Sequence, residues 1–149
     1  MSAIEAFLDS NVLLYALSDD PAERCKQERA AEILRTASFG ISYQVLMETW
    51  VVATRKFEKP VAEEKVLQFL DQLVEFPCAE ASVGLFRQAA VLSRQYGIHP
   101  YDAAIVAAAV NLGAPVLYSE DFNHGQIYSG VKVVNPFLAP SDPETRAHR

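Results

Sequence analysis

The chain has 149 residues, a length typical of one domain with a hydrophobic core of its own. Half of the residues are apolar, 21% are charged and the net charge is −6, which disfavours a general nucleic-acid-binding protein unless bound cations offset the acids. The longest uninterrupted apolar run, residues 103–110, is too short to cross a membrane, because a spanning helix needs roughly 20 residues.

The N-terminus and the two cysteines indicate the compartment. The chain reaches the acids Glu5 and Asp9 without a basic region followed by an apolar run, so we expect no signal peptide. Cys25 and Cys78 form no CxxC pair, and we expect both to be reduced thiols in a cytoplasmic protein.

Short apolar segments alternate with helix-like segments along the chain. In chain order we expect a strand at 4–8, helices at 12–17 and 21–37, a strand at 39–42, and helices at 43–57 and 60–73. A third strand is expected at 74–76, followed by helices at 81–96 and 100–113 and by strands at 115–119 and 131–134. Pro21, Pro60 and Pro100 fit the first turns of helices, and Gly97 fits a helix end.

This alternation predicts an α/β fold, a three-layer α/β/α sandwich around a mainly parallel sheet of four to five strands. Residues 1–137 are expected to form a single domain, and residues 138–149, which are polar and rich in proline, a flexible C-terminal tail. In such sheets ligands bind beyond the carboxyl ends of the strands. The residues that follow each strand are therefore the candidates for chemistry.

Two acids in the first half of the chain are candidates. Asp9 directly follows the first expected strand, although a helix cap in a turn would explain it equally well. Glu48 lies on an expected helix, and three of its four neighbours at spacings of three and four are apolar. We therefore expect it within or beside a buried face, where a carboxylate needs a partner or a metal. The alternative is a side chain at the edge of the apolar stripe that reaches solvent.

Two further acids lie in the second half. Asp102 is in the first turn of a helix that is apolar all round and so is expected to be buried; a favourable interaction with the helix dipole is the alternative explanation. Asp121 follows the expected strand at 115–119, and a simple turn acid is again the alternative. Its neighbour Glu120 is expected to point elsewhere, so that only one of the two belongs to a site.

The combination carries the prediction. The sheet topology can bring Asp9, Glu48, Asp102 and Asp121 to one edge, where four carboxylates would repel and raise each other's pKa values. Divalent cations relieve that repulsion, and oxygen ligands suit Mg²⁺ or Mn²⁺. Zinc is disfavoured because the three histidines have no ligand spacing with one another or with the cysteines.

Four stretches in this order resemble the PIN-domain family, and within it the VapC-type toxins of bacterial toxin–antitoxin pairs. They are Phe7-Leu8-Asp9-Ser10-Asn11-Val12-Leu13, Ile41-Ser42 with Val45-Leu46-Met47-Glu48, Tyr101-Asp102-Ala103-Ala104-Ile105-Val106-Ala107, and Leu117-Tyr118-Ser119-Glu120-Asp121-Phe122. Each motif alone is weak, but the ordered set is fairly specific. The resemblance covers residues 4–136, nearly the whole chain.

The resemblance implies a PIN-like α/β/α domain that hydrolyses RNA with Mg²⁺ or Mn²⁺. It implies Asp9, Glu48, Asp102 and Asp121 as the catalytic acids, with Asp9, Asp102 and Asp121 as metal ligands and Ser10, Asn11 and Ser119 in support. The turn after Ser119 departs from that of many relatives, and Asp121 is preferred to Glu120 because it fits a Ser/Thr-x-Asp pattern. A toxin of this type also implies an antitoxin partner and a homodimer.

Other interpretations remain open from the sequence. A non-catalytic PIN-like module that binds RNA or a protein would keep the same fold. A response-regulator receiver needs an Asp and a Lys where Ser42 and Ser119 stand, and an aspartate-nucleophile phosphatase needs Asp-x-Asp where Asp9-Ser10-Asn11 stands. For substrate grip, Arg55, Lys56 and Lys59 are candidates for phosphate contacts and Phe57 for base stacking, with a solvated helix end as the alternative.

Overall fold

The computed structural model describes residues 3–138 of the chain. They form a six-stranded sheet with the strand order β3-β2-β1-β4-β6-β5. Every neighbouring pair is parallel except β5 and β6. The strands are β1 Ala6–Leu8, β2 Phe39–Ser42, β3 Cys78–Ala79, β4 Val116–Tyr118, β5 Ile127–Tyr128 and β6 Val131–Val134. Apart from Leu138, the predicted flexible tail at 138–149 lies outside the described residues.

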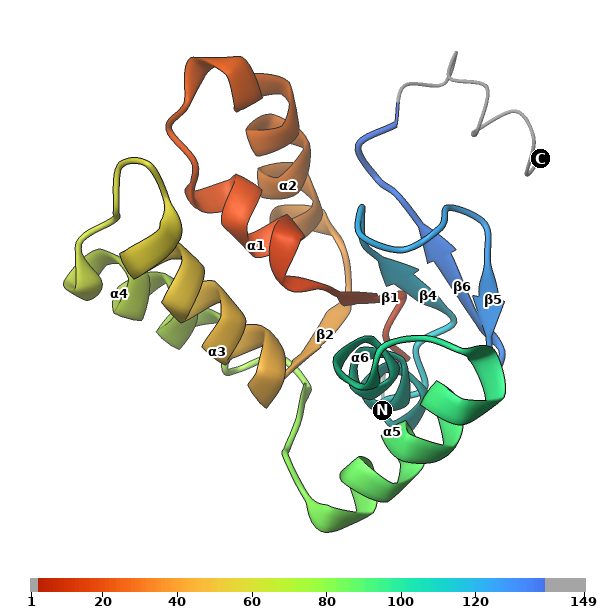
Figure 1. Ribbon diagram of the computed structural model, residues 1–149. Helices are drawn as coiled ribbons and strands as arrows, with labels where there is room; N and C mark the ends of the chain where they lie inside the picture. The colour runs from red at the N-terminus through yellow and green to blue at the C-terminus, as the bar shows by residue number, and fades with distance from the viewer. Residues whose placement is uncertain (1–2, 139–149) are drawn as a thin grey trace.

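Helices cover both faces of the sheet, as predicted (Figure 1). They are α1 Ser10–Leu17, α2 Arg24–Thr36 after a 3-10 turn at Pro21–Glu23, α3 Tyr43–Val51 with a π-helical turn at Val52–Lys56, α4 Glu63–Leu73, α5 Val83–Tyr96 and α6 Pro100–Asn111. α1 and α2 lie over one face and α5 and α6 over the other, while α3 and α4 flank the β2 end beside α1. The three-layer α/β/α prediction is confirmed.

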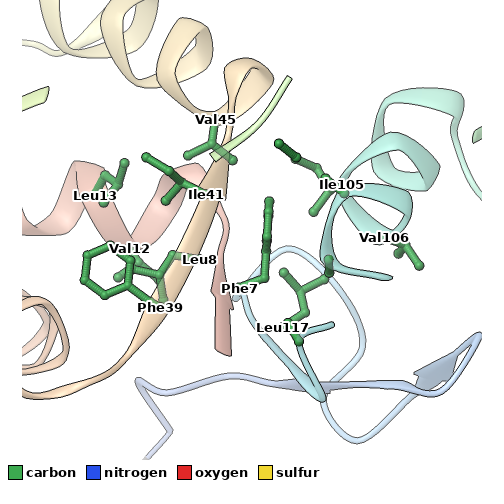
Figure 2. Close-up of a cluster of buried hydrophobic side chains, with 14 of the residues drawn as sticks. Phe7, Leu8, Val12, Leu13, Phe39, Ile41, Val45, Ile105, Val106 and Leu117 are labelled. Atoms are coloured by element: carbon green, nitrogen blue, oxygen red, sulfur yellow. The ribbon is translucent and has the colours of Figure 1, made fainter. Parts of the chain in front are cut away.

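The central strand β1 divides the core into two halves. Successive side chains of a strand point to opposite faces, so Phe7 and Leu8 project in opposite directions. Figure 2 shows Phe7 with Ile105 and Leu117 on the α6 side, and Leu8 with Val12 on the α1 side. All three residues of β1 are buried, which a strand covered on both faces requires.

Gly40 marks a close approach between β2 and the end of α6. A Cβ at this position would lie 2.7 Å from Leu112 Cδ1, 3.0 Å from Ile4 Cδ1 and 3.3 Å from the Pro77 carbonyl oxygen. Packing therefore favours glycine here, because a Cβ would push aside the ends of the Leu112 and Ile4 side chains and crowd the Pro77 carbonyl.

Two short strands differ from the prediction. The strand expected at 74–76 is wrong: Val74 ends α4, and the apolar Phe76 stacks on Phe39 with ring centroids 4.1 Å apart instead of pairing in the sheet. Pairing begins at the Pro77 carbonyl, which accepts a hydrogen bond from Ile41 N, and the strand follows as β3. The strand β5 was not predicted, and its hairpin to β6 turns through positive-φ residues at Ser129 and Gly130.

The described residues contain neither a membrane-spanning helix nor a disulfide. Within residues 3–138, no helix has both the length and the apolar character that crossing a membrane requires. Cys25 is exposed, Cys78 lies half-buried in β3, and both thiols are free, in agreement with the prediction that they form no disulfide.

Substituting Gly40 tests the packing at β2. Strand propensity alone favours Gly40→Val, but the steric clash is expected to lower the free energy of unfolding by about 1–3 kcal/mol. Chemical denaturation, read as a lower midpoint at unchanged slope, measures this effect. The control is Gly84→Ala in α5, where the added Cβ meets only Ser82 Oγ at 3.8 Å. Equal or higher stability of Gly40→Val would contradict the packing argument.

Candidate active site

The candidate site lies at the edge formed by the carboxyl ends of β1, β2 and β4. β1 lies between the other two in the sheet, and chain order reverses between β1 and β4. In α/β sheets a ligand-binding crevice forms beyond the carboxyl ends of the strands at such a reversal. The sequence places Asp9 and Ser119 directly after these two strands, so they meet across the reversal.

Asp9 is held at the centre of this edge. It is only 5% exposed, and it caps α1 while its backbone N–H donates to the Tyr118 carbonyl oxygen. Its Oδ1 accepts from the Ser10 backbone N–H at 2.8 Å, and its Oδ2 accepts from the Ser119 hydroxyl at 2.8 Å. Asp9 is therefore both the helix cap and the fixed carboxylate that the sequence left as alternatives.

Burial makes the charge on Asp9 unfavourable in the metal-free chain. Desolvation raises the pKa of Asp9 to about 6, against the opposing effect of the hydrogen bonds from Ser119 and Ser10. The negative charges of Glu48 and Asp121 make smaller contributions to the same rise. A cation bound at Asp9 would act in the opposite direction and restore the ionised form.

Glu48 projects from α3 toward the same edge. Glu48 is half-buried, as its apolar neighbours on the helix predicted. The Ser10 hydroxyl donates to Glu48 Oε2 at 3.1 Å, and Gln44 Nε2 donates to Oε1 at 3.0 Å. Because both oxygens are hydrogen-bonded, the Glu48 carboxylate is fixed in orientation. Ser10 links it to Asp9, because the Ser10 backbone N–H donates to the Asp9 carboxylate.

The turn after β4 separates the two adjacent acids. Asp121 Oδ2 accepts from Asn11 Nδ2 at 3.2 Å, and the same amide donates to Ser119 Oγ. Glu120 instead accepts from Tyr15 OH and pairs with Lys26 Nζ at 3.1 Å, on the side of α1 and α2. The structure therefore joins Asp121, and not Glu120, to the network around Asp9.

Asp102 completes the group from the opposite layer. It lies in the first turn of α6 and is exposed. Desolvation raises the pKa of its carboxyl, His99 opposes this shift, and the charges of Asp121 and Glu48 add to it. Asp102 is thus within electrostatic reach of two of the other acids, and all four predicted residues lie at one edge of the sheet.

Gln44 is a site residue that the sequence analysis missed. Besides Glu48, its Nε2 donates to the Tyr101 carbonyl oxygen at 3.1 Å, and so it ties α3 to the start of α6. The spacing of four residues to Glu48 was the available signal, since residues i and i+4 are neighbours on a helix. The contact with Tyr101 has no local signal, because it joins residues 57 positions apart.

The donor set fits a hard divalent cation at an open site. Within residues 3–138, no three Asp, Glu, His or Cys side chains are gathered closely enough to hold a metal ion together. Mg²⁺ can be bound by one or two carboxylates with water and phosphate oxygens, so it does not require such a group. Neither side-chain ion pair found in the described part of the chain includes any of the four acids, although the charge of His99 acts on Asp102.

The cations proposed for substrate grip lie elsewhere. Arg55 and Lys56 are exposed in the π-helical turn, while Phe57 is half-buried and packs against the core. Phe57 and Lys59 line a hollow whose other charged residues are all acidic. Such surroundings disfavour a phosphate group, so this segment gains no support as an RNA-binding surface.

Asp9→Asn tests the buried charge through stability. Since folding raises the pKa of Asp9 from 3.8 to about 6, the folded chain holds more protons in that range and its stability falls as pH rises through it. The substitution is expected to raise the free energy of unfolding of metal-free protein at pH 8 by up to about 3 kcal/mol, and to change it little at pH 4. Urea unfolding in EDTA measures the difference. Destabilisation at pH 8 would show that the charge is compensated in the fold.

Comparison with known proteins identifies the fold. The sequence profile of the PIN domain family matches residues 6–129. No curated protein matches the chain in sequence. Three solved structures share the fold at low identity, and one is VapC20 of Mycobacterium tuberculosis, described as a sarcin-ricin loop cleaving toxin. It is 15% identical over 77% of this chain and 88% of its own, with a TM-score of 0.61.

The other two are complexes. A toxin–antitoxin complex from Klebsiella pneumoniae is 21% identical over 89% of this chain and 98% of its own, with a TM-score of 0.63. FitAcB from Neisseria gonorrhoeae is 18% identical over 90% and 99%, with a TM-score of 0.62. The family profile spans the four clustered acids and the structures share the surrounding α/β fold, so the chain belongs to the PIN-domain family.

Proposed function

We propose that this PIN domain is a metal-dependent endoribonuclease that acts as the toxin of a type II toxin–antitoxin pair. The observation that carries the proposal is the buried carboxylate of Asp9, fixed by Ser10 and Ser119 and facing other acids, with no ion pair to a protein cation among the described residues. A fold uses such an arrangement to bind divalent cations, because buried charge without a partner is costly. Phosphodiester hydrolysis is the chemistry that those cations serve best.

Asp9 and Asp102 are the proposed principal ligands of Mg²⁺ or Mn²⁺, with Asp121 as a further ligand. The bound cation supplies Lewis acidity, which acidifies water and offsets charge on the phosphate. Ser119 and Ser10 hold Asp9 in one orientation, and Asn11 holds Asp121. Glu48, held by Ser10 and Gln44, would accept hydrogen bonds from water near the scissile phosphate. RNA as the substrate is proposed from membership of the family and from the toxin VapC20.

A cleavage assay tests the function. The purified chain with Mg²⁺ or Mn²⁺ is expected to cut at least one member of a panel of transfer, ribosomal and messenger RNAs, and EDTA is expected to stop it. Asp9→Asn and Asp121→Asn are expected to lower the rate by at least about 100-fold while the fold is kept, because each removes a proposed ligand. Glu120→Gln is the matched control, since Glu120 pairs with Lys26 away from the other acids, and it is expected to retain activity.

The outcomes separate two functions. Cleavage that survives in purified Asp9→Asn would overturn the assignment of the site. RNA binding without cleavage under any metal would instead favour the non-catalytic PIN-like module that the sequence left open.

The proposed antitoxin would dock in an acidic groove beside α1. A hollow of about 500 Å³ is lined by Phe57 and by acids that include Asp19, Glu23 and Glu58. A smaller hollow of about 190 Å³ shares Phe57 and Glu23 and continues to Glu120 and to Asn11, whose amide holds Asp121. This lining repels RNA and suits a segment with basic and apolar side chains, which would block the site from one side.

Charge reversal in the groove tests this docking. Asp19→Lys with Glu58→Lys is expected to weaken binding of the proposed antitoxin at least tenfold, because two attractive charges become repulsive. Both side chains are exposed, so the fold and the RNA cleavage rate are expected to be unchanged. Calorimetry measures the affinity, and unchanged affinity would place the antitoxin elsewhere.

Self-association and compartment complete the proposal. We propose a homodimer through α5, which exposes Val83, Phe86 and Val91 at 63–70% of their surface. Light scattering that gives a monomer at working concentration would contradict it. The proposed compartment is the cytoplasm, where the RNA substrates and reduced thiols occur.

A further inference from the structure

A hollow with a single charged lining residue adjoins the acids on the side opposite the acidic groove. It lies between α3 and the start of α6 and has a volume of about 340 Å³. Tyr43, Met47 and Tyr101 are among its lining residues, and they are 51%, 44% and 68% exposed. Large apolar and aromatic side chains exposed around one hollow indicate a binding surface.

This hollow is continuous with the acidic site. Glu48 lines it and is its only Asp, Glu, Lys or Arg residue, while Ser10 joins the same carboxylate to the backbone at Asp9. Gln44 also lines it and bridges Glu48 to the Tyr101 carbonyl. A group bound in the hollow therefore lies beside any phosphate held by the acids.

The lining has the chemistry that recognises a nucleobase. The Tyr101 ring is held in place by stacking on His99, with centroids 5.6 Å apart and planes 13° from parallel. Gln44 Nε2 donates its two hydrogens to Glu48 and to the Tyr101 carbonyl oxygen. The Gln44 Oε1 atom is therefore the part of the amide that can accept a hydrogen bond from a base. Proteins read unpaired RNA bases by stacking on aromatic rings and by hydrogen bonds to base edges.

Net charge makes base contacts necessary. The chain carries −6, so the phosphate attraction that dominates most nucleic-acid binding is weak here even with cations in the site. Stacking does not depend on charge, and it contributes substantially for each base.

Resting on the proposed ribonuclease function, we propose that this hollow binds the unpaired nucleobase next to the scissile phosphate, stacked on Tyr101. Tyr101 and Gln44 are then specificity-determining residues.

An abasic scan tests this proposal. The probe is a short single-stranded RNA that the wild-type chain cleaves, prepared as a series in which one base at a time is removed around the scissile bond. One position next to that bond is expected to show about a tenfold loss in kcat/KM, carried by KM, as expected for the loss of one stacked base. Tyr101→Ala is expected to cause a similar loss of kcat/KM on the intact RNA. In this variant, removing the base at that position is expected to cause no further loss. Tyr101→Phe keeps the ring and is expected to behave like the wild type.

Each result has one meaning. If the wild-type chain cleaves no RNA, the proposed ribonuclease function fails, and the proposal of a base-binding hollow fails with it. If it cleaves but the scan is flat and Tyr101→Ala is unaffected, the function stands and the base-binding hollow is refuted. If Tyr101→Ala changes the oligomeric state by light scattering and the scan stays flat, a second copy of the chain covers the hollow and the proposal is wrong. Thermal melting of Tyr101→Ala confirms that it folds.

Discussion

The burial of one carboxylate, that of Asp9, is the constraint on which the site depends. The chain places it at the end of the central strand, where it is 5% exposed and where burial raises its pKa to about 6. Such a position is unfavourable for a charge and favourable for a cation ligand, because a dry carboxylate binds a cation without first losing water. The fold tolerates it by supplying one backbone and one hydroxyl donor, from Ser10 and Ser119.

Those donors connect Asp9 to the rest of the edge. Ser10 donates through its backbone to Asp9 and through its hydroxyl to Glu48, so the two acids are positioned by one residue. Ser119 donates to Asp9 while it accepts from Asn11, which also holds Asp121. The network thus crosses from β1 to β4 and from α1 to α3. A change at one small polar residue would therefore alter the orientation of two acids at once.

The sequence predicts those features that local pattern determines. Asp9, Glu48 and Asp102 were found because each lies next to a strand end, on an apolar helix face or at a helix start, and these patterns span only a few residues. The strand β3 was misplaced because Phe76 is apolar for a tertiary reason, its stacking on Phe39. Gln44 was missed as a link because its partner Tyr101 lies on another helix. Asp121 was preferred to Glu120 on a local Ser/Thr-x-Asp pattern, but the residues that hold Glu120 away from the site, Lys26 and Tyr15, are distant in sequence and were not predicted.

Negative charge assigns different partners to the two sides of the acids. On the α1 side, the groove that ends at Glu120 is lined by carboxylates, and RNA phosphates are repelled there whatever cations occupy the site. On the α6 side, the hollow bordered by Tyr101 contains Glu48 as its one Asp, Glu, Lys or Arg residue and offers ring and amide surfaces. An RNA chain crossing the acids would therefore run toward α6, while a basic protein segment would approach along α1. Inhibitor and substrate would then compete only at the acids themselves, so one docked segment could block cleavage without occupying the base-binding hollow.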